Sequence, residues 1–248
     1  MHRIEEGVCS VCGERLAVSG ISATTASAAA QPACTTRDSR CGLCRRTEPL
    51  FARALAYGSY TGGLRDLIHL LKYERVRPAA KVLGRMLSEV VAELAESFGA
   101  TPPVVVPVPL YSRKLHERGF NQSELVTRVA LKLRPAGLEL ALKSGVLKRL
   151  RPTLSQTGLT REQRVENVRG AFSVVHPEEV RGRSVLIVDD VFTTGTTVSE
   201  CARILLRSGA TKVWVATVAR TLKHEAVYAV SDENREMDGV KLGRAAHG

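Results

Sequence analysis

Residues 185–197 read Val-Leu-Ile-Val-Asp-Asp-Val-Phe-Thr-Thr-Gly-Thr-Thr, and no other stretch constrains the fold of this chain as strongly. Four apolar residues, three of them β-branched, predict a buried strand of a parallel sheet. Two acidic residues end the apolar run, and helical spacing returns between Val198 and Arg207. A strand, a polar loop and a helix in this order place the loop at the carboxyl edge of an α/β sheet, where such sheets bind ligands.

This loop offers suitable groups for a sugar phosphate. Backbone N–H groups at the start of a helix can hold a phosphate, and threonine hydroxyls add donors. The predicted phosphate-binding residues are Thr193, Thr194, Gly195, Thr196 and Thr197. No lysine follows the glycine and no set of three spaced glycines is present, so the stretch is neither a Walker loop nor a dinucleotide fingerprint.

Asp189 and Asp190 are the candidate catalytic residues, because their carboxylates can accept hydrogen bonds from vicinal sugar hydroxyls. Successive strand residues point to opposite faces, so only one acid is expected to face a ligand directly unless the strand bends. The alternative interpretation is a plain strand-to-helix turn with capping threonines and solvated acids.

Two Cys-x-x-Cys pairs near the amino terminus predict a metal site. Cys9 and Cys12 form the first pair, Cys41 and Cys44 the second, and each pair can offer two thiolates from one tight turn. This spacing favours structural zinc over disulfides in a cytosolic chain. Such an ion would contribute folding energy to the lobe that carries it. Cys34 is left out because it has no paired neighbour, and four incidental thiols are the alternative.

We expect a second loop, rich in basic residues, at the end of the strand 104–106. Arg113 and Arg118 can bind pyrophosphate oxygens bidentately, and Lys114 adds a point charge. Residues 111–169 hold 13 lysines and arginines against 5 acidic residues, in a chain of net charge +11. A polyphosphate or a nucleic acid would suit this charge, whereas a solvated basic face is the alternative.

Apolar periodicity divides the chain into three parts: a cysteine lobe (1–48), an α/β domain (49–222) and a disordered polar tail (231–248). Strands are expected at 51–60, 104–106, 146–150, 171–175, 185–188 and 212–219, with helices between them, which predicts a parallel sheet flanked by helices. The amino terminus has no apolar signal region and no run approaches the ~20 residues of a membrane span. We therefore expect a cytoplasmic protein without membrane insertion.

The apolar run, paired acids and Thr-Thr-Gly-Thr-Thr loop resemble the phosphoribosyl pyrophosphate (PRPP) motif of type I phosphoribosyltransferases. With Leu70-Leu71-Lys72-Tyr73, the cysteine pairs and Arg118-Gly-Phe-Asn-Gln122, the chain resembles the ComF family of competence-associated phosphoribosyltransferase-like proteins. The resemblance implies a type I phosphoribosyltransferase fold with a small zinc lobe. It also implies PRPP bound with Mg²⁺, displacement at the anomeric carbon with pyrophosphate leaving, and the pyrophosphate role for 113–118.

The resemblance further implies a hood over the substrate at 151–167, where Arg151, Gln156 and Arg164 are candidate lid contacts. A helix and loop that only pack on the sheet are the alternative. Three functions compete: a PRPP-dependent transferase of unidentified acceptor, a single-stranded DNA-binding competence protein that holds PRPP without transfer, and an adaptor on a retained fold. Expected partners are therefore PRPP, single-stranded DNA or competence proteins. Aromatic residues make up only 4% of the chain, which disfavours binding by base stacking.

Overall fold

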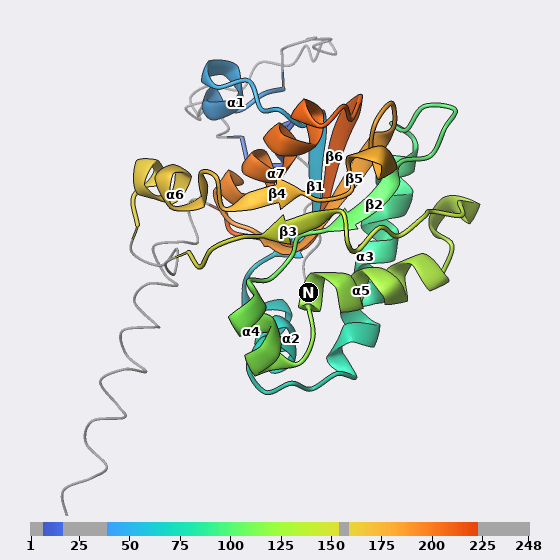
Figure 1. The fold of residues 1–248 in the computed structure, drawn as a ribbon. Helices are drawn as coiled ribbons and strands as arrows, with labels where there is room; N and C mark the ends of the chain where they lie inside the picture. Colours follow the sequence, from blue (N-terminus) through green and yellow to red (C-terminus); the bar gives the residue numbers. More distant parts are fainter. Residues whose placement is uncertain (1–6, 17–38, 154–158, 223–248) are drawn as a thin grey trace, which may run out of the picture.

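The computed structural model describes residues 7–16, 39–153 and 159–222 (Figure 1). A four-stranded parallel sheet runs through its centre in the order β1 (Arg53–Ser59), β6 (Lys212–Arg220), β5 (Ser184–Phe192) and β2 (Val104–Pro107). The helices are α1 (Gly42–Arg46), α2 (Gly62–Lys72), α3 (Ala79–Ala95), α4 (Ser112–Arg118), α5 (Gln122–Lys132), α6 (Arg161–Val168) and α7 (Thr196–Arg207). Two 3₁₀ turns lie at Pro135–Gly137 and Pro177–Glu179. The predicted α/β fold of the type I phosphoribosyltransferase class is confirmed.

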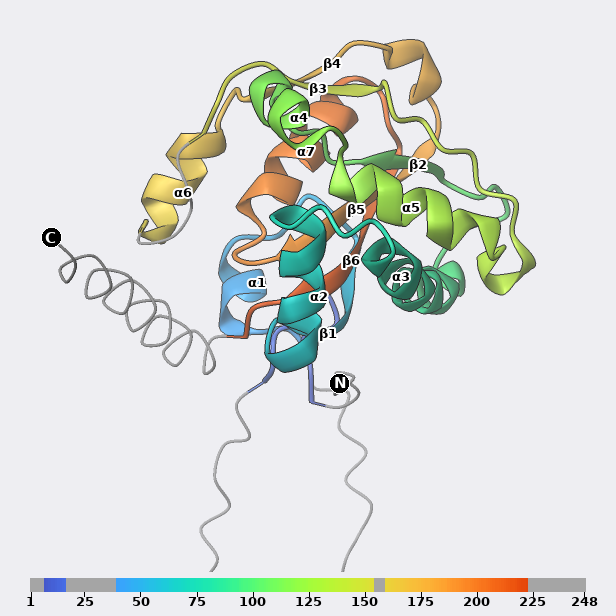
Figure 2. The ribbon, with the colours of Figure 1, turned by 90° about the horizontal axis from the view of Figure 1, so that it is seen from below.

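Alternate residues of the central strands enter two separate cores, because successive side chains of a strand point to opposite faces. Val185 and Ile187 of β5 pack with α7, whereas Leu186 and Val188 pack with α2, α3 and α5. Burial on both faces explains why this strand is continuously apolar in sequence. In Figure 2, α3 and α5 lie side by side beyond the sheet. On α3, Val82 is exposed and the next residue, Leu83, is buried.

The strands predicted near 146–150 and 171–175 exist, but they do not join the parallel sheet. They form β3 (Leu147–Arg149) and β4 (Phe172–Val174), an antiparallel pair. Phe172 and Val146 are buried against the α7 side of the molecule. The pair therefore covers the face that Asp189 shares with Val185 and Ile187, and α6 lies beyond it (Figure 1).

The cysteine lobe lies against one end of the sheet rather than apart from it. The backbone N–H of Ala54 in β1 donates to the carbonyl of Val11 at 2.7 Å. All four predicted cysteine ligands belong to the same apolar core as Phe51 and Phe192. The residues on either side of the boundary expected at residue 48 therefore share one apolar core. Cys34 and the tail 231–248 lie outside the described residues.

Across the described parts of the chain, no helix has the length and apolar character needed to cross a membrane.

Candidate functional site

The loop between β5 and α7 leads into a helix whose N-cap residue is a glycine. Gly195 occupies this position at φ +76°, and it makes no side-chain cap. The Oγ1 atoms of Thr194 and Thr196 lie 3.2 Å apart. The first N–H groups of a helix have no partner within the helix, and such helix starts commonly bind anions.

Gly195 is required sterically as well as conformationally. A Cβ atom at this position would lie 2.6 Å from Cζ of Phe192, closer than side-chain carbons approach. Its positive φ also disfavours any residue with a side chain. The backbone of the loop can therefore press against the ring of Phe192, and the two together set the shape of the loop.

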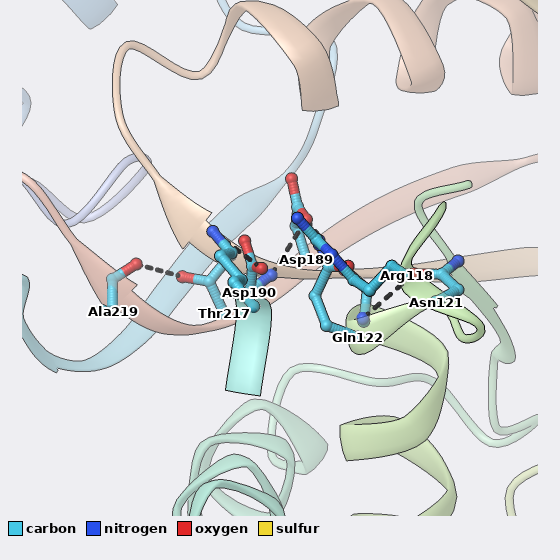
Figure 3. Close-up of polar contacts among 9 residues, drawn as sticks. Arg118, Asn121, Gln122, Asp189, Asp190, Thr217 and Ala219 are labelled. Carbon is cyan, nitrogen blue, oxygen red and sulfur yellow. Dashed lines mark hydrogen bonds and ion pairs between the residues drawn. The ribbon is translucent and has the colours of Figure 1, made fainter. Parts of the chain in front are cut away.

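Asp189 and Asp190 point to opposite faces of β5, as the alternation of a strand predicts (Figure 3). Oδ1 of Asp189 accepts hydrogen bonds from Oγ of Ser123 at 3.0 Å and from the backbone N–H of Asp190 at 2.9 Å. Burial, followed by the charge of Asp190, raises the pKa of Asp189 to about 7. Asp189 borders the same small space as Thr193, Gly195 and Thr197, so it is the acid that faces the loop.

Asp190 is buried on the other face and is paired with Lys72, the last residue of α2. The Nζ atom of Lys72 lies 2.9 Å from Oδ2 of Asp190. Burial by itself would lower the pKa of Lys72, but the charge of Asp190 outweighs it and the pKa is raised. Asp190 thus anchors the end of α2 to β5, whereas Asp189 borders the loop of residues 193–197.

A pocket of about 430 Å³ opens between α4 and the β3–β4 pair. It contains two of the three residues predicted to bind pyrophosphate. Its lining consists of Tyr111, Arg113, Lys114, Glu117, Arg149, Pro152 and Thr153. The segment 113–118 was expected to be a loop, but it is helix α4, with polar side chains on most of its surface. Arg113 also donates to Oε1 of Glu117 at 2.8 Å.

Arg118 does not join Arg113 and Lys114 in this pocket. Its guanidinium donates to Oε1 of Gln122, as Figure 3 shows, and lies 5.9 Å from the centre of the Tyr73 ring. The pairing with Gln122 turns its charge toward the end of α2 instead of toward β3. The structure thus separates the predicted pyrophosphate residues into two places.

The predicted lid residues make local contacts. Arg151 donates to the carbonyl of Arg169 at 2.7 Å, and Nε of Arg164 donates to the carbonyl of Leu159 at 3.0 Å. Gln156 lies outside the described residues. Helix α6 of this segment packs against α7. The hood over a substrate, and contact of these side chains with a ligand, stay predictions.

The four predicted metal ligands come together in one cluster. The Sγ atoms of Cys9, Cys12, Cys41 and Cys44 all lie within 4.8 Å of one another, and all four residues are buried. The Sγ atoms of Cys12 and Cys41 are 3.7 Å apart. Four Zn–S bonds of about 2.3 Å in a tetrahedron separate the sulfurs by about 3.8 Å, so the donor set fits a tetrahedral thiolate site.

Sequence reasoning missed several residues that the fold brings to the site. Lys72 was named only as part of a motif, and Ser123, Arg149 and Arg220 were not singled out. Arg149 lies 5.3 Å over the Phe172 ring, and burial lowers its pKa while the charge of Asp189 opposes that shift. Of these four residues, only Lys72 carries a pattern that could be recognised in the sequence, because it is a charged residue at the end of an apolar helix face.

Comparison with known proteins agrees with this geometry. The model of the phosphoribosyl transferase domain matches residues 123–238. The chain is 39% identical over 183 residues to the DNA utilization protein YhgH of Salmonella typhi, covering 73% of this chain and 78% of that protein. The Escherichia coli K12 protein of the same name is 36% identical over 221 residues, covering 87% and 91% of the two chains.

The competence protein F of Haemophilus influenzae is 31% identical over 182 residues, covering 73% of this chain and 78% of that protein. These relatives align along most of their length. Together with the paired acids, the threonine loop on α7 and the cluster of four cysteines, they show that this chain belongs to the ComF family of phosphoribosyltransferase-like proteins.

Proposed function

We propose that the protein binds PRPP, as its Mg²⁺ complex, at the carboxyl end of β5 and transfers the phosphoribosyl group to an acceptor. The observation that carries this proposal is the juxtaposition of Asp189 with the N-terminus of α7, whose N-cap residue is Gly195. The 5′-phosphate would lie on the amides of 193–197, because N–H groups at a helix start attract anions. The carboxylate of Asp189 would then accept a hydrogen bond from a ribose hydroxyl.

The proposed reaction breaks the bond between the anomeric carbon and pyrophosphate and forms a bond from that carbon to the acceptor. Positive charge develops on the ribosyl group, and negative charge on the leaving pyrophosphate. Arg113, Lys114 and Arg149 line the pocket near this point and would neutralise the leaving group. Holding both ends of PRPP fixes the reacting geometry and lowers the entropic barrier.

Asp190 and Lys72 have a positioning role in this proposal. Their ion pair ties the end of α2 to β5, directly behind Asp189. The neighbouring charge of Asp190 helps keep the pKa of Asp189 high. A Mg²⁺·PRPP complex would favour the ionised form of Asp189, so ligand binding would release a proton near neutral pH.

We further propose that the cysteine cluster holds zinc, which would supply folding energy to the lobe. Cys9, Cys12, Cys41 and Cys44 would be the ligands. The protein would act in the cytoplasm, in a process that uses imported DNA, as the names of the relatives from Salmonella, Escherichia and Haemophilus suggest.

The second candidate function is binding of single-stranded DNA, with PRPP held as a ligand and no productive transfer. Its support is the exposed basic surface of α4, where the Arg113 side chain is 83% exposed, together with the names of the relatives. DNA binding of this kind would weaken steeply with salt, because phosphate contacts release counterions.

Pyrophosphate release decides between these functions. The protein is incubated with Mg²⁺·PRPP and pools of nucleobases or amines, and the pyrophosphate formed per protein molecule is counted. Transfer predicts many turnovers in at least one pool, loss in Asp189→Asn and retention in Arg128→Gln, which removes an exposed arginine of α5. PRPP binding without turnover in any pool, with salt-sensitive DNA binding, would favour the second function.

A further inference from the structure

Arg220, the last residue of β6, joins the cysteine lobe to the body of the domain. It is only 3% exposed. Its Nη2 atom donates to Oε2 of Glu14 at 2.9 Å, and its Nη1 atom donates to the carbonyl of Cys12. Both acceptors lie on the turn that carries Cys9 and Cys12. One guanidinium thus holds the backbone of the metal turn and neutralises the buried acid beside it.

The other side of the same guanidinium contacts the end of β5. Its central carbon lies 5.0 Å from the centre of the Phe192 ring. The carbonyl of Phe192 accepts a hydrogen bond from the N–H of Thr221, next to Arg220, at 2.9 Å. The Phe192 ring in turn lies against Gly195, where a Cβ would clash with it. A continuous path of contacts therefore runs from Cys12 to the phosphate loop.

The metal turn is well suited to pass a displacement along this path. Within it, Cys9 donates to the carbonyl of Glu14 and Gly13 donates to the carbonyl of Cys9, both at 2.8 Å. A Cβ on Gly13 would lie 3.3 Å from Nη1 of Arg220, so the turn and the guanidinium are closely packed. Because these bonds tie the turn together, a change in the sulfur positions would move the carbonyl of Cys12.

We infer that Arg220 is a positioning residue that couples the cysteine metal centre to the phosphate loop, so that metal and PRPP each strengthen the binding of the other. This inference rests on the proposed function, because it takes 193–197 as the phosphate cradle. Coupling of two binding sites is reciprocal, so a ligand that orders the loop must also slow loss of the metal. A guanidinium is needed because it can hold two acceptors in its plane while its face covers an aromatic ring.

The test compares zinc-loaded wild type with Arg220→Lys. Lysine keeps a positive charge beside Glu14, but it cannot bind Glu14 and Cys12 in one plane while covering Phe192. Arg128→Gln is the matched control, because Arg128 also pairs with a glutamate, Glu124 at 2.6 Å, but on the exposed side of α5. Two quantities are measured: the rate of zinc release to a chelating dye with and without Mg²⁺·PRPP, and hydrogen exchange of the amides of 193–197.

We expect PRPP to slow zinc release at least fivefold in wild type and in Arg128→Gln, and less than twofold in Arg220→Lys. Without PRPP, exchange in the loop should be at least fivefold faster in Arg220→Lys than in the control, with zinc retained. If the lysine variant does not hold zinc, Phe192→Leu replaces it, because that change breaks the path at the loop end and leaves the metal turn intact.

The experiment distinguishes a failure of the proposed function from a failure of the coupling through Arg220. If wild type does not bind PRPP, the proposed function is wrong, and the exchange measurement alone decides the coupling. If PRPP binds and slows zinc release equally in wild type and in the variant, the coupling through Arg220 is wrong while the function stands. Equal loop exchange in the variant and the control would also overturn the coupling.

Discussion

Lys72 and Asp190 form a buried ion pair across the junction of α2 and β5, with Nζ 2.9 Å from Oδ2. The two side chains are 17% and 7% exposed, so both charges are largely removed from water. Such a pair depends on both partners, because either one left alone is an uncompensated charge. The pair holds the end of α2 against β5, next to Asp189. The role of Asp190 is therefore largely structural.

Removal of one partner should therefore cost more stability than removal of both. We expect Lys72→Met and Asp190→Asn each to lower the free energy of unfolding by about 3 kcal/mol. The double variant should recover most of that loss, because neither charge is then left unpaired. Urea denaturation of the four proteins measures this, and losses that simply add in the double variant would contradict the pairing.

Asp189 differs from this pair, because removal of its charge should stabilise the folded protein at high pH. Its pKa is raised by burial to about 7, so the folded protein holds the proton in the range where the unfolded chain has lost it. The stabilising contribution is complete below the unfolded pKa near 4, and it is lost as the pH rises toward 7. Asn accepts the same bonds from Ser123 and the Asp190 N–H, without a charge.

Asp189→Asn should consequently raise the free energy of unfolding at pH 8 by on the order of 2 kcal/mol, with little difference at pH 4. Unfolding of wild type and variant over this pH range checks the prediction. A variant that is less stable than wild type at pH 8 would show that the buried carboxylate is compensated more fully than its environment indicates.

Gly195→Ala tests the packing of the phosphate loop. The added Cβ would lie 2.6 Å from the Phe192 ring, at a backbone φ of +76°. We expect a loss of stability of 2 kcal/mol or more, of which about 1 kcal/mol is the cost of the positive φ, together with weaker PRPP binding. Gly182→Ala is the control, because its φ is +71° and no atom lies within 4 Å of the Cβ position. Equal losses in both variants would mean that contact with Phe192 contributes nothing.

Cys41→Ser should release the metal and destabilise the lobe, since structural zinc supplies folding free energy. The matched control is Cys201→Ser, which changes another fully buried cysteine, on α7 and outside the cluster. Elemental analysis of the purified proteins should find one zinc per chain in wild type and in the control, and far less in Cys41→Ser. Equal zinc in all three would contradict a four-cysteine site.

Arg113→Gln should weaken binding of inorganic pyrophosphate several-fold, because Arg113 lines the pocket beside α4. The control is Arg128→Gln, since Arg128 also pairs with a glutamate four residues away on a helix, at 2.6 Å, but on the exposed side of α5. Calorimetric titration with pyrophosphate compares the two. Equal affinity in both variants would exclude Arg113 from the pyrophosphate site.

The strand, loop and helix around Asp189 were predictable because local signals agree there: a continuous apolar run, a glycine that tolerates positive φ, and helical spacing after it. The same holds for the cysteine pairs. Helix α4 was missed because its seven residues show no apolar stripe. The pairing of β3 with β4 was missed because strands of three residues are too short to show alternation.

The sequence does not predict which residues pair when they lie far apart in the chain. Nothing local in the sequence joins Lys72 to Asp190, or Arg220 to Glu14, because such ion pairs are created by the packing of α2 on the sheet and of the metal turn on β6. The direction of Arg118 is a similar case. Its pairing with Gln122 depends on the turn between α4 and α5, whose positive φ at Gly119 redirects the chain.

The central claim is that Asp189 and the loop of residues 193–197 bind PRPP. Calorimetric titration of the zinc-loaded protein with PRPP, with and without Mg²⁺, tests it most directly, alongside Asp189→Asn and the Arg128→Gln control. We predict Mg²⁺-dependent binding in wild type and in the control, at least tenfold weaker in Asp189→Asn although that variant is folded. Absence of binding at millimolar PRPP, or unchanged affinity in Asp189→Asn, would contradict the claim.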